Sequence, residues 1–194
     1  MSILSDRTIE WAIKEGHIRI DPFDPAQLNG ASYDLTLGDE VALYDKWVDH
    51  VGVAQPYVMD ASEEPAVRRW KMSERGQVLA PGIGYLMHTR ERIWTEQFVP
   101  VLDGKSSVGR LFIQVHITAG YGDPGFDGQY TLEVVAVHPV RIYAGMRIAQ
   151  MRFHELSESV SKERLYGAAG HYRGSLAEGP VPSQAFRQFK KKGG

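Results

Sequence analysis

Apolar residues recur with helical spacing only near the start of the chain. Ile9, Ala12 and Ile13 fall on one face of a helix, with polar residues between them. Ser5 can cap such a helix at its N-terminus, and Gly16 is suited to end it. The pattern therefore predicts one short amphipathic helix over residues 5–16.

Beyond this helix, apolar residues occur in short β-rich runs separated by turn signals such as Asn29-Gly30 and Pro81-Gly82. We expect strands at His17–Ile20, Tyr33–Leu37, Glu40–Tyr44, Gln77–Met87, Arg92–Val101, Leu111–Ile117, Tyr130–His138, Val140–Ile142 and Arg147–Phe153. Many short strands indicate a mainly β sandwich, jelly roll or barrel. Long helices between strands are absent, which argues against a doubly wound nucleotide-binding fold.

The length of 194 residues favours a single domain. Residues 45–76 are less regular, and we expect a surface insertion or a long hairpin there. From about residue 157 the composition shifts to Ser, Glu, Gly and Pro, which is typical of a tail that is frayed or becomes ordered only on binding.

Composition and charge exclude several classes of function. With 22 Lys and Arg against 24 Asp and Glu, the net charge is −2, so there is no electrostatic case for binding nucleic acid or an anionic membrane. The chain has no cysteine, which excludes thiol catalysis, Fe–S clusters and the His/Cys/Cys zinc site of the zinc deaminases. It also has no apolar run of spanning length and no apolar signal-peptide core. We expect a cytoplasmic protein.

The segment Gly104–Arg110, with the sequence GKSSVGR, contains two hydroxyls, two cations and two glycines. Hydroxyl and amide donors at a turn, together with an arginine, can bind phosphate. The same composition also occurs in plain solvated turns, and it is not a Walker loop because the earlier glycine is missing. Its own residues leave both interpretations open.

A second unusual feature is Glu133, an acid between Leu132 and Val134 on an expected strand. A carboxylate facing the core is costly unless it is paired or serves in proton transfer. Because side chains alternate along a strand, Glu133 can instead face solvent.

Several motifs in a fixed order identify a resemblance. GKSSxGR, HxTAG, DPGFxGxxTLE and GMRIAQ, with SILSDRTIE and GASYDLTLG before them and AGHYRG and PVPS after them, resemble the dCTP deaminase family of the superfamily that includes the trimeric dUTPases. Only about residues 45–76 lie outside the resemblance. The Ala119-Gly120-Tyr121 run is most similar to the members that both deaminate dCTP and hydrolyse dUTP.

The resemblance implies a distorted jelly-roll β-barrel of the dUTPase-like type, assembled as a homotrimer with active sites between subunits. It implies a deoxynucleoside triphosphate substrate (dCTP or dUTP), Mg²⁺ bound with the triphosphate and no zinc. Glu133 matches the general base for deamination, with Ser106 and Arg110 beside it, and Asp123 matches the group that activates water for attack on the α-phosphate. Substrate-binding positions implied in the same way are Lys105, Ser107, His116, Thr118, Ala119, Phe126, Gln150, Tyr166, His171 and Ser175.

The residues of the tail depart from the family pattern. His171 stands where the family has Lys, and Ser175 stands where it has Gln. These changes leave open an enzyme that acts only as a dUTP diphosphatase, or one that acts on a modified deoxycytidine nucleotide. A non-catalytic nucleotide-binding module of the same fold is a further alternative.

Overall fold

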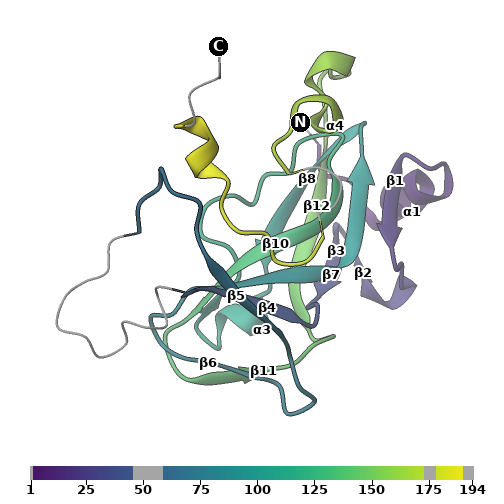
Figure 1. Ribbon diagram of the computed structural model, residues 1–194. Coiled ribbons are helices and arrows are strands. Elements are labelled where there is room, and N and C mark those ends of the chain that lie inside the picture. Colours follow the sequence, from purple (N-terminus) through teal and green to yellow (C-terminus); the bar gives the residue numbers. More distant parts are fainter. Residues whose placement is uncertain (1, 46–58, 173–177, 190–194) are drawn as a thin grey trace.

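The computed structural model describes residues 2–45, 59–172 and 178–189 (Figure 1). The fold is mainly β with one short N-terminal helix, as predicted. Its strands are β1 (Ile18–Asp21), β2 (Leu28–Asn29), β3 (Ser32–Thr36), β4 (Glu40–Tyr44), β5 (Val67–Lys71), β6 (Gln77–Leu79), β7 (Tyr85–Thr95), β8 (Phe98–Gly104), β9 (Ile113–Gln114), β10 (Asp127–Ala136), β11 (Val140–Ile142) and β12 (Arg147–Glu155).

The predicted helix is α1 (Asp6–Lys14). The Ser5 hydroxyl caps it by accepting a hydrogen bond from the Thr8 amide at 3.4 Å, and Gly16 follows its end at φ 76°. Shorter helical segments are η1 (Pro25–Gln27), α3 (Ser106–Gly109), η2 (Lys162–Arg164), α4 (Tyr166–Ala169) and η4 (Ala185–Gln188). None of the helices in the described part of the chain has the length and apolar character needed to cross a membrane.

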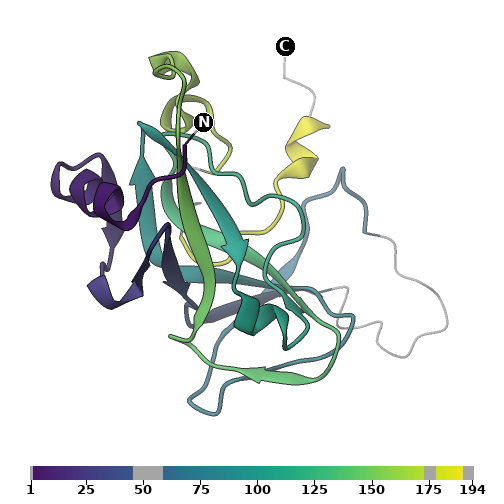
Figure 2. The same ribbon diagram turned by 180° about the vertical axis from the view of Figure 1, so that it is seen from behind.

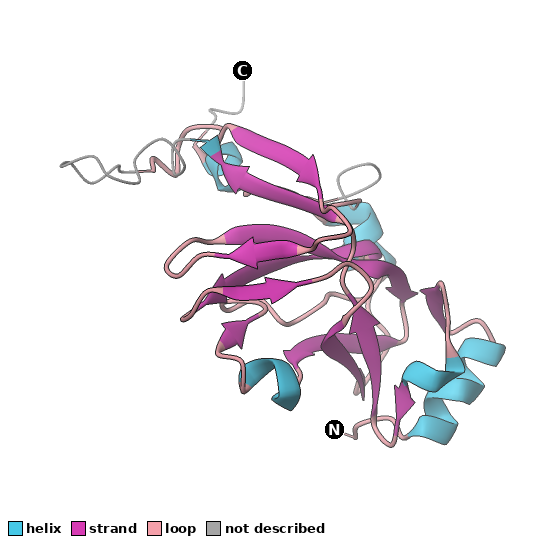
Figure 3. Cartoon of the chain, turned by 90° about the horizontal axis from the view of Figure 1, so that it is seen from below, coloured by secondary structure: helices cyan, strands magenta, loops and turns pink. Residues whose placement is uncertain are grey.

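Two antiparallel sheets form the body of the molecule (Figures 1 and 3). A six-stranded sheet has the order β5-β4-β7-β10-β9, with β1 also paired to β7, and a four-stranded sheet has the order β2-β3-β12-β8. The pair β6–β11 forms a small separate sheet at one end. Figure 2, from behind, shows α3 beside the strands of the four-stranded sheet.

The core consists of apolar side chains that both sheets direct inward. Its largest fully buried members include Tyr33, Leu35, Met87, Ile93, Leu132, Ile148 and Phe153. Strands of the two sheets contribute alternate residues to it, which is the expected arrangement where two antiparallel sheets share one core.

Turn chemistry corrects three of the strand predictions. The expected strand Gln77–Met87 is two strands, because Pro81 and Gly82 (φ 74°) make a turn between β6 and β7. The expected strand Arg92–Val101 is divided between β7 and β8, where the Thr95 hydroxyl accepts hydrogen bonds from the next turn.

The expected strand Leu111–Ile117 is reduced to the two residues of β9. The chain leaves α3 through Phe112, which has a φ of 54° and therefore cannot belong to a strand. Within the less regular segment 45–76, the hairpin prediction holds for the described part, where β4 pairs with β5, and residues 46–58 lie outside the described residues.

Candidate active site

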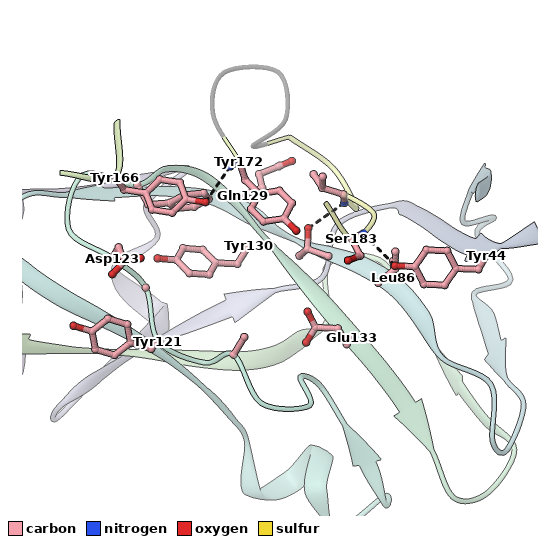
Figure 4. A pocket seen from close by; sticks show the side chains of 15 residues that line it. Tyr44, Leu86, Tyr121, Asp123, Gln129, Tyr130, Glu133, Tyr166, Tyr172 and Ser183 are labelled. Carbon is pink, nitrogen blue, oxygen red and sulfur yellow. Dashed lines mark hydrogen bonds between the residues drawn. The ribbon is translucent and has the colours of Figure 1, made fainter. Parts of the chain in front are cut away.

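One pocket of about 360 Å³ lies over the outer face of β10, within the size range of roughly 300–1,000 Å³ that is common for small-molecule sites (Figure 4). It contains both acids singled out by the sequence, Asp123 and Glu133. Its lining comprises Tyr44, Leu86, Ala119, Tyr121, Gly122, Asp123, Phe126, Gln129, Tyr130, Thr131, Glu133, Tyr166, Tyr172, Val181 and Ser183.

Strand β10 supplies one wall of the pocket. Gln129, Thr131 and Glu133 occupy alternate positions, so their side chains leave the same face of the sheet. Between Gln129 and Thr131 the register with β7 shifts from Arg92 to His88, so β7 carries two more residues than β10. Such irregularities locally re-aim side chains, and here Tyr130 also reaches the pocket.

The turn that carries Asp123 is held against the start of β8. The Gly122 amide donates a hydrogen bond of 2.8 Å to the Pro100 carbonyl, and the Phe126 amide donates one of 3.2 Å to the Asp123 carbonyl. A side chain at position 122 would overlap the Tyr130 hydroxyl and approach Pro100 Cγ to 2.9 Å. Gly122 is therefore needed for Asp123 to lie this close to β10.

Aromatic side chains surround Asp123. The Phe126 ring packs edge-on against Tyr130 at 4.9 Å and against Tyr166 at 5.3 Å between ring centroids. Burial raises the pKa of the Tyr130 phenol, and the charge of Asp123 raises it further. Burial and, to a lesser extent, the charges of Tyr172 and Asp123 also raise the pKa of Tyr166. Both phenols are consequently protonated at neutral pH and can donate hydrogen bonds.

Glu133 lies further along the same wall (Figure 4). It is half-buried, whereas its neighbours Leu132 and Val134 are fully buried on the opposite face of β10. Its Oε2 accepts a hydrogen bond of 3.2 Å from the Ile117 amide. Glu133 thus faces the pocket and not the core. A carboxylate in this position has free lone pairs and can accept a proton from water in the pocket.

The tail segment 178–189 contributes a second wall of the pocket, through Val181 and Ser183. The Gly179 amide donates a hydrogen bond of 2.8 Å to Gln129 Oε1, and the Val181 amide donates one of 3.0 Å to Thr131 Oγ1. The tail therefore runs alongside β10 in the same direction, with Gly179 and Val181 next to Gln129 and Thr131. In Figure 1 this yellow segment crosses in front of β10.

Two tyrosine hydroxyls accept the next amides of the tail. The Ser183 amide donates to Tyr44 at 3.1 Å, and the Gln184 amide donates to Tyr172 at 3.1 Å. Phe186, only 2% exposed, anchors the segment beyond them. The described part of the tail thus has a defined path along β10 and contributes Val181 and Ser183 to the pocket lining.

The structure brings five of the expected site residues together in the pocket, namely Glu133, Asp123, Phe126, Tyr166 and Ala119. It does not bring Ser106, Ser107 or Arg110 there. These three residues belong to α3 or its end and are exposed. Arg110 makes no side-chain hydrogen bond or ion pair to Glu133 among the described residues, so the pairing expected beside this carboxylate is not made within one chain.

The remaining expected residues lie outside the pocket lining. Lys105 is paired with Asp34, and Gln150 accepts a hydrogen bond from Ser32 at 3.1 Å and donates one to the Gly104 carbonyl at 3.0 Å. The others are half-buried His116, exposed Thr118 and exposed His171. Ser175 lies outside the described residues.

Sequence reasoning missed part of the lining. Gln129 and Thr131 were detectable, because they precede Glu133 at the two-residue period of a strand. Tyr44, Val181 and Ser183 carried no signal, since they lie about 90 residues before Glu133 or about 50 after it and only folding brings them near.

Comparison with known proteins shows which family the chain resembles. The sequence profile of the dCTP deaminase-like family matches residues 3–156. A "dCTP deaminase, dUMP-forming" of Leptospira biflexa is 37% identical over 175 residues, covering 90% of this chain and 91% of that protein. One of Hathewaya histolytica with the same name is 37% identical over 188 residues, covering 97% of this chain and 99% of that protein.

The fold comparison agrees with the sequence comparison. The crystal structure of 2'-deoxycytidine 5'-triphosphate deaminase from Agrobacterium tumefaciens superposes with a TM-score of 0.58 at 21% identity, covering 79% of this chain and 48% of that chain. At this identity the likeness concerns the fold alone. Together with the sequence matches, which extend over most of the chain and include both pocket acids, it confirms the resemblance: the chain belongs to the dCTP deaminase family.

Proposed function

We propose that this protein deaminates dCTP to dUTP and ammonia and then hydrolyses the dUTP to dUMP and pyrophosphate. The observation that carries the proposal is that Asp123 and Glu133, two acids with different surroundings, line one pocket. The relatives named above, whose name specifies dUMP as the product, support the coupled reaction.

In the deamination step, Glu133 takes a proton from a water molecule. The resulting hydroxide adds to C4 of cytosine while Glu133 returns the proton to ring nitrogen N3. Glu133 then takes the proton of the new C4 hydroxyl and passes it to the amino group, so that the C4–N bond breaks, ammonia departs and the C4 carbonyl of uracil forms. The backbone donor at Ile117 holds one oxygen of Glu133 in place, so the other can face the water.

In the hydrolysis step, Asp123 takes a proton from a second water molecule, which attacks the α-phosphorus while the bond to the pyrophosphate oxygen breaks. Asp123 is exposed in the pocket and can meet this water. Phe126 would stack on the deoxyribose and disfavour a 2'-hydroxyl, and its place in the pocket lining next to Tyr130 supports this role.

Mg²⁺ fits this site as an ion that arrives with the triphosphate. It prefers oxygen ligands and usually keeps phosphates and waters around it. The described residues include no cluster of three or more acids and histidines that would hold an ion by themselves, and the pocket offers Asp123 as an exposed carboxylate. When bound, Mg²⁺ would neutralise phosphate charge and make the α-phosphorus more electrophilic.

We infer that the protein works as a homotrimer with active sites between subunits, the assembly that its family resemblance implies, and the separation within one chain of Glu133 from Ser106 and Arg110 supports it. Ser106 and Arg110 are exposed and do not line the pocket of their own chain. Beside them, Leu111 is 47% exposed and Phe112 59% exposed, next to Val137 at 62%. Adjacent exposed apolar residues of this kind mark an interaction surface.

Mixing two inactive variants tests this arrangement. Arg110→Ala and Glu133→Gln trimers are each expected to be inactive in deamination. If the two groups come from neighbouring subunits, random exchange of subunits restores about a quarter of the sites. No recovery after verified exchange would place Arg110 and Glu133 in the same subunit or in unrelated roles.

Turnover of dCTP tests the reaction itself. Purified protein is incubated with dCTP and Mg²⁺, and the nucleotides are separated by ion exchange over time. We expect dUMP without lasting dUTP. Unchanged dCTP with dUTP consumed in a parallel reaction would assign a dUTP diphosphatase, and no turnover of either, with binding retained, would assign a binding module.

A single-domain organisation with residues 157–194 closing over the nucleotide, and a cytoplasmic location, remain predictions.

A further inference from the structure

A buried carboxylate outside the pocket organises the residues that precede α3. Asp34, in the middle of β3, is 2% exposed. Its oxygens accept hydrogen bonds from Lys105 Nζ, from Asn29 Nδ2 at 2.9 Å and, more loosely, from an Arg147 guanidinium nitrogen at 3.4 Å. An ionised carboxylate buried to this extent requires such partners, because its desolvation is otherwise uncompensated.

The four-stranded sheet ties the same region at a second point. Gln150 on β12 lies opposite Asp34 on one side and Asp103 on β8 on the other. Its amide links Ser32 to the Gly104 carbonyl. The end of β8 is therefore fixed to the middle of the sheet immediately before Lys105.

The ion pair between Lys105 and Asp34 leaves the Lys105 ammonium able to bind a second anion. Asp34 forms ion pairs with two cations, Lys105 and Arg147, while the buried carboxylate of Glu91 nearby bonds Thr36 and Gln27 and neither of these cations. A lysine ammonium has three donors, of which Asp34 uses one, and the Lys105 side chain remains 21% exposed. Lys105 can thus be held by Asp34 and still donate to an anion.

We propose that Asp34 is a positioning residue for the phosphate end of the substrate, acting by holding Lys105 in one orientation beside Ser106 and Ser107. The inference rests on the proposed function, on the expectation from the family resemblance that Lys105 and Ser107 bind the substrate, and on the homotrimer, in which this exposed segment would meet the triphosphate in a neighbouring subunit's pocket. A free lysine would lose rotamer entropy each time it bound phosphate, and Asp34 removes that cost in advance.

A double-mutant cycle on KM and kcat for dCTP tests the proposal. Asp34→Asn and Lys105→Met are each expected to raise KM by about tenfold to a hundredfold, the range of one charge-assisted hydrogen bond, with a smaller change in kcat. The double variant should be no worse than Lys105→Met alone. Effects that multiply would show that Asp34 does not act through Lys105 and would overturn the proposal.

Two further variants separate positioning from folding. Asp34→Glu keeps the charge but moves it by one methylene at a buried site, so positioning predicts a raised KM in a protein that still melts cooperatively, although at a lower temperature. If neither variant at position 34 shows a cooperative melting transition, the residue is structural and the proposal fails. Asp39→Asn, which breaks only the exposed pair with Lys71 at 3.3 Å, is the matched control and should leave KM unchanged. A wild-type protein that turns over neither dCTP nor dUTP would count against the proposed function instead.

Discussion

The backbone amide of Ile117 donates a hydrogen bond of 3.2 Å to the carboxylate of Glu133. This contact joins two motifs that are sixteen residues apart in the sequence, HxTAG and TLE, at one point of the pocket. It fixes the orientation of Glu133 without neutralising its charge, which is what a general base needs.

Replacing Glu133 by Gln keeps the size of the side chain but removes its basicity. We expect ammonia release from dCTP to fall by about 10²–10⁴-fold, the usual contribution of a general base, while hydrolysis of supplied dUTP persists. Both rates are measured on one preparation. Glu10→Gln, at an exposed position of α1, is the control. Ammonia release that survives in Glu133→Gln would remove the assignment.

Asp123→Asn should have the reverse effect. Without its carboxylate the pocket cannot activate water at the α-phosphorus, so we expect dCTP to be converted to dUTP that accumulates. The products are followed by ion-exchange chromatography. If dUMP still forms at the wild-type rate, Asp123 serves only to shape the Asp-Pro-Gly turn.

Gly122→Ala tests whether close packing sets the position of Asp123. The added Cβ would overlap the Tyr130 hydroxyl and lie 3.0 Å from the Pro100 carbonyl oxygen, so the turn must move. We expect dUTP hydrolysis to fall by at least tenfold and the free energy of unfolding to fall by about 1–3 kcal/mol, as for overpacking in a core. Gly30→Ala, where a Cβ meets nothing within 4 Å, is the matched control and should change neither quantity.

Tyr172→Phe removes the hydroxyl that accepts the Gln184 amide at 3.1 Å. We expect faster hydrogen exchange at Gln184 and a KM for dCTP raised by about fivefold, as expected for the loss of one hydrogen bond of ~1 kcal/mol. Tyr143→Phe, at a residue 48% exposed after β11, controls for the loss of a phenol. Unchanged exchange at Gln184 would show that Tyr172 does not hold the tail.

Asp127→Asn should destabilise the protein in a pH-dependent way. Burial alone would raise the pKa of Asp127, but hydrogen bonds from Arg92 at 2.7 Å and from Arg19 at 2.5 Å lower it below its usual value. A carboxyl with a depressed folded-state pKa stabilises the protein above its unfolded pKa of about 3.9, and this contribution is lost as the pH falls through the folded value. The difference in free energy of unfolding between the wild type and Asp127→Asn, measured by urea titration, should therefore be largest at pH 7 and decline as the pH falls below about 3.9 toward the lower folded-state pKa. A difference that does not decline over this range would mean that packing and not charge is responsible.

Local patterns predicted much of the fold. Period and capping placed α1 within one or two residues, and alternation placed β4 and β11 at their observed bounds. The errors occurred where a turn interrupts an apolar run, as at Pro81-Gly82 between β6 and β7, because hydrophobicity continues through the turn while the backbone does not. No pattern in the sequence predicts the positive φ of 54° at Phe112.

The ordered motifs identified the family and both pocket acids from the sequence alone, because their residue types, order and spacing are specific to one family. Only the tertiary structure decided which side Glu133 faces, since an isolated strand can present either face to the core. It alone showed that Arg110 and Glu133 do not meet within one chain and that the tail reaches the pocket through Tyr44 and Thr131. It also showed that Asp34 holds Lys105. The contacts of the tail and of Asp34 join residues 50 or more positions apart, and such pairings are set by sheet topology and packing, which local sequence patterns do not encode.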